Sequence, residues 1–240
     1  MSITKTASNI TAPTQFLQLR NERYAYRRYG MATARPLLFL QHFTGTLDNW
    51  DPAVTDPLAS GREVILFESA GVGRSTGKVP ETVAGMAMHA LAFLDGLEVK
   101  TCDVLGFLHG GMVAQQIAQD RPSIFRRMIL VGTAPRGGED IMHLEKPRLA
   151  RYMGDPNLRG YAVLPKIFFP LTESSQAAGE AFIPTGDGHR GLFVRRHVAQ
   201  QLAFEHPDMV SATDPARHRS AWWRRDFRRF IDYAWPFLNA

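Results

Sequence analysis

The stretch that most constrains the fold is residues 102–116, which read CDVLGFLHGGMVAQQ. A short apolar run at Val104 and Leu105 leads into glycines at 106, 110 and 111, and apolar residues then recur at helical spacing. This order predicts a strand, a tight turn and a helix. In a G-x-S-x-G elbow, such a turn raises its central residue above the edge of a parallel sheet, and the flanking glycines let helix and strand approach closely.

The centre of this elbow is occupied by an unreactive residue. The frame here reads G-F-L-H-G, so Leu108 stands at the central position. A leucine side chain has no hydroxyl, thiol or carboxylate, and it cannot attack a carbonyl carbon. The sequence therefore presents the frame of an enzyme without its usual nucleophile.

The segments around the elbow predict an α/β domain with a mainly parallel central sheet and helices on both faces. Residues 15–30 alternate in polarity and predict an antiparallel hairpin at the sheet edge, with a turn at Asn21-Glu22. Continuous apolar runs predict buried strands at 36–41, 63–67 and 127–132. A helix is expected at 86–97. The resulting order is strand, loop, strand, helix, strand, helix, strand, which favours right-handed crossovers.

Length and composition predict three regions. We expect a flexible tail at 1–14, one domain at 15–205, and a divergent basic, aromatic tail at 206–240. Within the domain, the irregular, proline-containing stretch 137–181 is expected to form a helical lid. Of the net charge of +5, nine arginines and five acidic residues place +4 in the last 51 residues. Because this tail lacks a recognised nucleic-acid-binding fold, no nucleic-acid partner is expected.

Other compositional features exclude several classes of protein. The longest apolar runs are far shorter than the roughly 20 residues needed to cross a bilayer, so no membrane span is expected. The N-terminus lacks the apolar core of a secretory signal, and we expect a cytoplasmic protein. The single cysteine, Cys102, excludes a disulfide within the chain, and the histidines show no metal-ligand spacing. No cofactor and no metal are expected.

Three motifs in order resemble the α/β-hydrolase superfamily, particularly its small, cofactor-free esterase and haloperoxidase-like members. They are Gln41–Gly45 after the first buried strand, Gly71–Ser75 after the next, and Gly106–Gly111 at the elbow. The likeness covers roughly residues 15–183 and implies a truncated α/β-hydrolase fold. It also implies that the backbone N–H groups of Phe43 and His109 form an oxyanion hole. Because these donors belong to the main chain, they survive a change of side chain.

The chain departs from the family pattern in its other catalytic elements. No segment looks like the further buried strand that the family follows with an orienting aspartate. Gly188-His189 matches the pair after the family's final strand, which makes His189 the candidate base. The acid that orients it could be Asp187, or Glu139 or Asp140 after the 127–132 strand, where some family members carry it.

Two histidines and one glycine-rich segment near the elbow can be interpreted as structural rather than functional. His109 could act as a general base if it reaches substrate with a suitable pKa, but packing against the pocket wall is the favoured interpretation. His42 is interpreted as structural. Gly71–Ser75 lacks the lysine of a phosphate-binding loop and is interpreted as a tight turn beneath the pocket.

The resemblance leaves two functions open. One is an enzyme acting on esters or related acyl bonds of small, largely apolar metabolites, either weakly or through base chemistry at His109 or His189, because ordinary serine hydrolysis requires the nucleophile that Leu108 replaces. The other is a non-catalytic ligand-binding or vestigial protein. A leucine held in a strained elbow would cost about 1–3 kcal/mol, so a relaxed turn would favour decay of the site.

Overall fold

The computed structural model describes residues 7–43 and 45–136, together with residues 155, 157, 172, 173, 176 and 177. The elements from the first strand to the last belong to one compact unit. In a second unit, the Gln176 N–H donates to the Thr172 carbonyl (2.9 Å), as in one turn of a helix. The expected lid at 137–181 lies almost entirely outside the described residues, and the expected tail at 206–240 lies wholly outside them.

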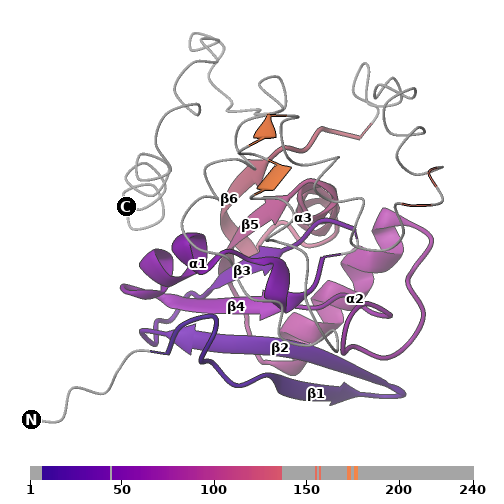
Figure 1. Ribbon diagram of the computed structural model, residues 1–240. Coiled ribbons are helices and arrows are strands. Elements are labelled where there is room, and N and C mark those ends of the chain that lie inside the picture. Colours follow the sequence, from indigo (N-terminus) through magenta and orange to yellow (C-terminus); the bar gives the residue numbers. More distant parts are fainter. Residues whose placement is uncertain are drawn as a thin grey trace, which may run out of the picture. The chain divides into compact units, whose positions relative to one another are not determined.

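The described unit is built on a mixed, mostly parallel sheet in the order β1-β2-β4-β3-β5-β6 (Figure 1). Strands β3, β4, β5 and β6 are parallel, and β1 and β2 join them as an antiparallel pair. The sequence prediction of an α/β fold with a mainly parallel sheet is confirmed. The strands are β1 Gln15–Leu19, β2 Glu22–Gly30, β3 Leu37–Leu40, β4 Glu63–Phe67, β5 Cys102–Phe107 and β6 Phe125–Val131.

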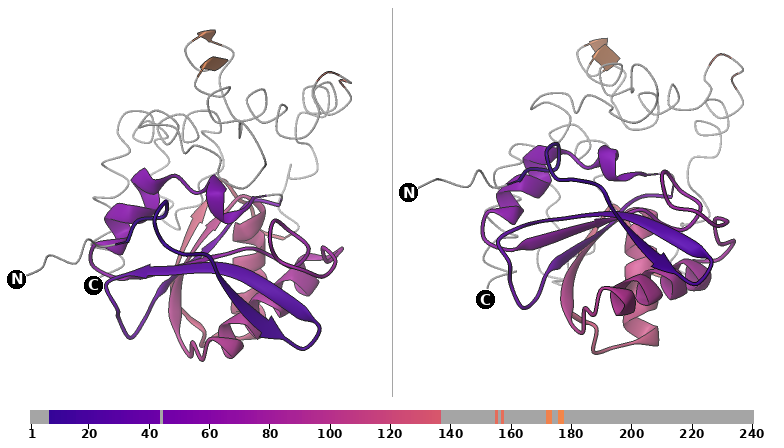
Figure 2. Two further views of the ribbon diagram at one scale, coloured as in Figure 1. Left: turned by 60° about the horizontal axis from the view of Figure 1, so that its bottom comes forward. Right: turned by 90° about the horizontal axis from the view of Figure 1, so that it is seen from below.

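Helices cover both faces of this sheet, as predicted. Figure 2 shows α1 (Pro52–Ala59) on one face and α2 (Val83–Gly96) and α3 (His109–Asp120) on the other. Because successive side chains of a strand point to opposite faces, neighbouring residues serve different layers. Phe39 packs edge-on against Trp50 on the α1 side (4.8 Å between ring centroids), whereas Phe67 contacts Phe93 of α2 on the other side (4.4 Å).

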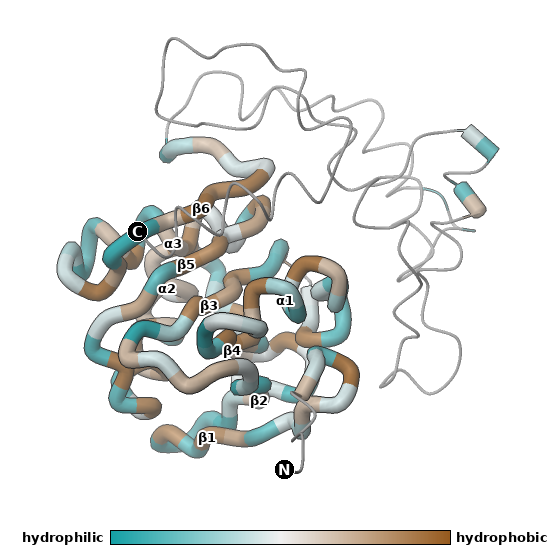
Figure 3. Tube along the Cα trace, turned by 90° about the vertical axis from the view of Figure 1, so that its left-hand side faces the viewer, coloured by the Kyte–Doolittle hydropathy of each residue, from teal (hydrophilic) through white to brown (hydrophobic). Residues whose placement is uncertain are grey.

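The central strands are apolar on both faces. The four residues of β3 are all buried, and Figure 3 shows β3 as an apolar stretch within the sheet, while polar residues interrupt the β1–β2 hairpin. A strand covered by helices on both sides exposes neither set of side chains to water, which explains its continuous apolar run. Among the described helices, none combines the length and apolarity needed to cross a membrane.

The hairpin forms at the sheet edge as predicted, with a small difference at its turn. β1 ends at Leu19 and β2 begins at Glu22, so the turn lies at Arg20-Asn21, one residue earlier than expected. Arg20 adopts a positive φ of 51° there. The register pairs Leu17 with Tyr24, which places β2 between the edge strand and β4.

The segment between β3 and β4 was expected to be a loop, and this expectation is wrong. It contains a 3-10 turn, η1 (Leu47–Asn49), and the helix α1. Asp51 caps α1 by accepting the Ala53 N–H (2.7 Å), and Pro52 occupies the first helical position, where no N–H is needed. The helix is only eight residues long and contains Pro57, so it lacks a clear apolar period in the sequence.

Candidate functional site

The elbow between β5 and α3 keeps a strained backbone. Leu108 has φ 49° and ψ −117°, in a region that residues with a side chain seldom occupy. Its N–H donates to the Val131 carbonyl of β6 (2.8 Å), and its carbonyl accepts the Gly111 N–H (3.0 Å). The predicted strand, sharp turn and helix are therefore confirmed, and the turn has not relaxed around the leucine.

Three glycines permit the close approach of α3 to the sheet at this turn. A Cβ on Gly106 would lie 2.6 Å from the Gly111 Cα, and a Cβ on Gly110 would overlap the Leu40 carbonyl of β3. A Cβ on Gly111 would lie 2.5 Å from the Thr133 Cγ2. Real Cβ atoms do not come this close to other heavy atoms, so each of these positions requires glycine.

The Leu108 side chain is half-buried beside the chain segment that follows β6. A Cβ built on Gly132 would lie 3.1 Å from the Leu108 Cδ2 and 3.7 Å from the Phe107 ring, so both side chains approach this glycine. The position that carries a nucleophile in a G-x-S-x-G elbow is thus occupied by a half-buried hydrocarbon side chain.

The loop after β3 lies beside the elbow. Gln41 Oε1 accepts the His42 N–H (3.0 Å), and the Gly45 N–H donates to the His42 carbonyl (2.9 Å), which turns the chain around Phe43. The Phe43 side chain is 54% exposed, and its ring meets the His109 ring edge-on with 5.5 Å between centroids. The structure therefore brings together the two residues whose N–H groups the sequence nominated as oxyanion donors.

Neither of those N–H groups is engaged within the described part of the chain. His109 is the first residue of α3, where a helical N–H has no partner inside the helix. The main-chain hydrogen bonds between described residues include none from the Phe43 or His109 N–H. Two donors, one at the end of a parallel strand and one at a helix N-terminus, suit an oxygen that carries partial negative charge.

The two histidines of the site favour the neutral state. Burial lowers the pKa of His42 to about 4 and also lowers the pKa of His109 below its usual range. The His42 ring packs edge-on against Phe107, with 6.1 Å between centroids. A neutral imidazole near pH 7 can accept a proton, so His109 has the protonation state that a general base needs.

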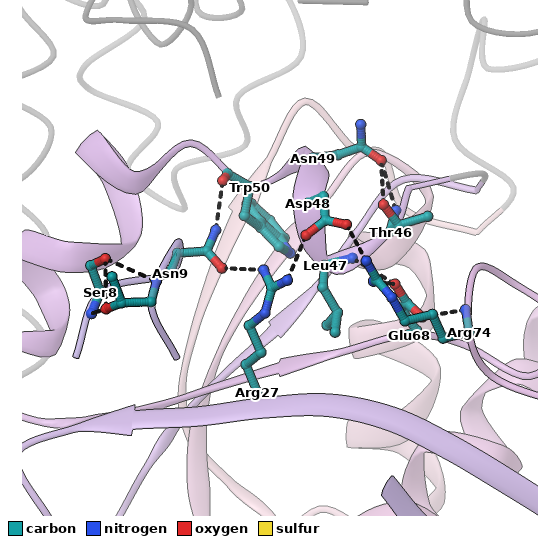
Figure 4. A network of polar contacts seen from close by, with 11 residues as sticks. Ser8, Asn9, Arg27, Thr46, Leu47, Asp48, Asn49, Trp50, Glu68 and Arg74 are labelled. Carbon is teal, nitrogen blue, oxygen red and sulfur yellow. Dashed lines mark hydrogen bonds and ion pairs between the residues drawn. The ribbon is translucent and has the colours of Figure 1, made fainter. Parts of the chain in front are cut away.

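A buried polar network supports the loop from below (Figure 4). Glu68 is fully buried and accepts the N–H groups of Leu47 (3.1 Å) and Arg74 (2.6 Å). Burial is the largest influence on Glu68 and raises its pKa. A Cβ on Gly73 would lie 2.6 Å from this carboxylate, and Gly73 also has a positive φ of 58°. The predicted tight turn at Gly71–Ser75 is confirmed, and it encloses a carboxylate that the sequence did not nominate.

Other members of the network also escaped the sequence analysis. Asn9, Arg27 and Asp48 come from the N-terminal segment, β2 and η1, and their hydrogen bonds join segments that are distant in the chain. Opposite charges in a sequence do not show which of them will pair. Conversely, the candidate base His189 and the candidate acids Asp187, Glu139 and Asp140 lie outside the described residues.

Comparison with known proteins settles the family. A model of the alpha/beta hydrolase fold matches residues 35–238. The chain belongs to the alpha/beta hydrolase fold family. The match extends beyond residue 183, the limit of the stretch over which the motifs carry the resemblance.

Solved structures of alpha/beta hydrolases share the fold. An alpha/beta hydrolase fold protein from Chitinophaga pinensis is 42% identical, with a TM-score of 0.65, over 73% of this chain and 62% of that one.

Two curated relatives are similar in sequence over part of their length. RutD of Variovorax paradoxus, named as a carbamate hydrolase, is 29% identical over 108 residues, which make up 44% of this chain and 41% of RutD. A poly(3-hydroxyalkanoate) depolymerase of Ectopseudomonas oleovorans is 32% identical over 130 residues, or 54% of this chain and 44% of the depolymerase. The chain thus spans less than half the length of these two curated relatives.

Proposed function

We propose that this alpha/beta hydrolase binds small, largely apolar acyl compounds, such as esters or carbamates, through their carbonyl oxygen. The Phe43 and His109 N–H groups would be the donors, and the side chains of Phe43 and Leu108 would contact the apolar part of the ligand. We further propose that bound compounds are hydrolysed slowly by water, without a covalent acyl-enzyme.

The observation that carries this proposal is the strained backbone at Leu108. Residues held in sparsely populated regions of φ and ψ cost about 1–3 kcal/mol and tend to cluster at functional sites. In this chain the serine that usually benefits from the elbow is absent, yet φ remains 49°. The same turn also sets the direction of the His109 N–H at the start of α3, so keeping the turn keeps a carbonyl-binding donor.

The relatives support the class of ligand. The names of two relatives refer to a carbamate hydrolase and a polyester depolymerase. Both names imply chemistry at a carbonyl carbon bonded to oxygen or nitrogen. A carbonyl oxygen gains negative charge when such a carbon is attacked, and main-chain donors stabilise that charge whatever side chain stands at the elbow.

The proposed reaction needs a base but no nucleophilic side chain, because water is the nucleophile. A water oxygen would attack the carbonyl carbon while the neutral His109 ring accepts its proton, and the tetrahedral intermediate would then expel the leaving group with that proton. Losing the serine removes most of the rate, although an oxyanion hole and binding alone retain about 10³- to 10⁴-fold over water in an unrelated protease. We therefore expect a slow enzyme.

The first experiment tests the carbonyl site itself. A fluorophosphonate probe, whose phosphoryl oxygen binds in an oxyanion hole, should not label position 108 in the natural chain. It should label a Leu108→Ser variant, because the serine then stands beside intact donors. A Leu108→Ser variant that folds but resists the probe would point to wider loss of the site, because labelling requires a base that activates the serine as well as the two donors.

The second experiment tests catalysis. Hydrolysis of short p-nitrophenyl esters by the natural chain is compared with that by His109→Ala and His189→Ala variants. We expect the rate to fall in His109→Ala. Equal residual rates in all three proteins would reject hydrolysis and leave carbonyl binding without catalysis, the function that the hydrocarbon side chain of Leu108 favours.

A further inference from the structure

The loop that carries Phe43 has little structure of its own. Between the end of β3 and the start of α1, the residues that the structure describes form one regular element, the three-residue turn η1. Within the loop, Asn49 accepts the Thr46 N–H (2.8 Å), which closes η1 locally. The position of the loop relative to the sheet must therefore be set by contacts with other segments.

Those contacts converge on η1. The Leu47 N–H donates to Glu68, and Asp48 accepts from two arginines, with 2.6 Å to the Arg27 Nη2 and 2.7 Å to the Arg74 Nη2. Figure 4 shows Asp48 lying between these two guanidinium groups. Farther along, the Asn9 side chain donates to the Trp50 carbonyl (2.8 Å).

Arg74 connects the two carboxylates of the network. Its Nη2 contacts Asp48, its Nη1 contacts Glu68 (3.2 Å), and its own N–H donates to the second Glu68 oxygen (2.6 Å). The Arg74 and Asp48 side chains are only 19% and 17% exposed, and Glu68 is fully buried. Ion pairs so shielded from water are sensitive to the loss of one partner, because the remaining charge is left buried.

The charges in this network balance, and Arg74 is essential to the balance. Arg27 and Arg74 face Asp48 and Glu68, two charges of each sign. Without the Arg74 guanidinium, Asp48 and Glu68 would repel one another, and among the contacts of the described residues Arg27 would remain to compensate. These two carboxylates hold η1, which begins four residues after Phe43, so a shift there would move the Phe43 N–H.

We propose that Arg74 is a positioning residue for the carbonyl site: through Asp48 and Glu68 it holds the loop that carries the Phe43 N–H in place beside His109. The inference rests on the proposed function for its consequence in catalysis. A lysine would not replace Arg74 fully, since an ammonium group is a compact point charge and cannot span two carboxylates as a planar fork does.

The kinetic test uses the Leu108→Ser background, in which a fluorophosphonate reports the oxyanion site. Arg74→Gln and Arg74→Lys are added to it, with Arg121→Gln as the control, since Arg121 pairs with Asp95 at the surface. Because small misplacements of a reacting geometry cost up to about 100-fold, we expect Arg74→Gln to slow the bond-forming step roughly 10- to 100-fold. The probe's binding constant should change little, Arg74→Lys should be intermediate, and the control should match its parent.

Amide NMR of the natural chain decides the matter independently of labelling. In Arg74→Gln the Phe43 N–H resonance should shift, whereas the Ile117 N–H in α3 should stay in place. A lower melting temperature with an unchanged bond-forming rate, or an unmoved Phe43 resonance, would show that Arg74 only stabilises the fold and would overturn the inference. A Leu108→Ser chain that is never labelled, together with a shifted Phe43 resonance, would instead uphold the positioning role and reject the proposed function.

Discussion

Replacing Leu108 by glycine should yield a more stable protein than replacing it by alanine, the reverse of the usual order. Both variants remove the Leu108 side chain beyond Cβ, so their difference isolates the effect of a Cβ at φ 49°. A side-chain-bearing residue in such a region costs about 1–3 kcal/mol. Glycine gives back about 0.5–1 kcal/mol through its greater freedom in the unfolded chain.

The net expectation is that the free energy of unfolding of the glycine variant exceeds that of the alanine variant by roughly 0–2.5 kcal/mol. Met88 provides the control, because it is 62% exposed within α2 and has ordinary helical geometry. There, glycine should be less stable than alanine by about 1 kcal/mol. The change in unfolding free energy from the alanine to the glycine variant should therefore differ between positions 108 and 88 by about 1–3 kcal/mol.

Urea denaturation followed by tryptophan fluorescence and circular dichroism measures both increments. Trp50 is buried against Phe39 and reports on the sheet next to the elbow. If glycine is less stable than alanine by the same amount at 108 as at 88, the elbow is not strained. The main observation behind the proposed function would then be lost.

Two further predictions concern burial and charge. Burial lowers the pKa of His42 to about 4, so between pH 6.5 and 4 the unfolded state binds more protons than the folded state, and the free energy of unfolding should decrease as the pH is lowered. In a His42→Phe variant the urea midpoint should decrease less over the same range. Parallel curves for the two proteins would contradict this. Asp103 is fully buried between Arg62 and Arg126, so Asp103→Ala should lose about 3–5 kcal/mol of unfolding free energy. Asp95 pairs with Arg121 at the surface, so Asp95→Ala should lose less than about 1 kcal/mol of unfolding free energy. Similar losses in the two variants would refute the distinction between a buried and an exposed ion pair.

The strands and the elbow were predictable because their signals are local. The apolar runs of β3 and β4 and the alternation of the hairpin reflect burial on two faces or on one, and the glycines reflect close contact within one short segment. The α2 helix was also found, although it begins at Val83 rather than Met86. Its start depends on the Thr82 side chain, which accepts the Gly85 N–H, and an apolar period does not report such a cap.

The short helix α1 and the partners of His89 were beyond the reach of the sequence pattern. An eight-residue helix with two prolines has too few apolar positions to show a period. His89 Nδ1 lies 2.5 Å from the Tyr24 hydroxyl oxygen and 3.0 Å from a Glu22 carboxylate oxygen. That contact links α2 to β2, and nothing in either segment alone identifies the other as its partner.

The amino-acid sequence alone determined that no nucleophile stands at the elbow, since the identity of residue 108 excludes it, and that a strand, turn and helix surround that position. Only the tertiary structure decided that the turn keeps its strain, that Phe43 meets His109, and that Arg74 joins Asp48 to Glu68. The physical reason is the distance along the chain over which each effect acts. Residue type and spacing govern chemistry and backbone conformation over a few positions, whereas burial and charge pairing depend on which distant segments the packed sheet brings together.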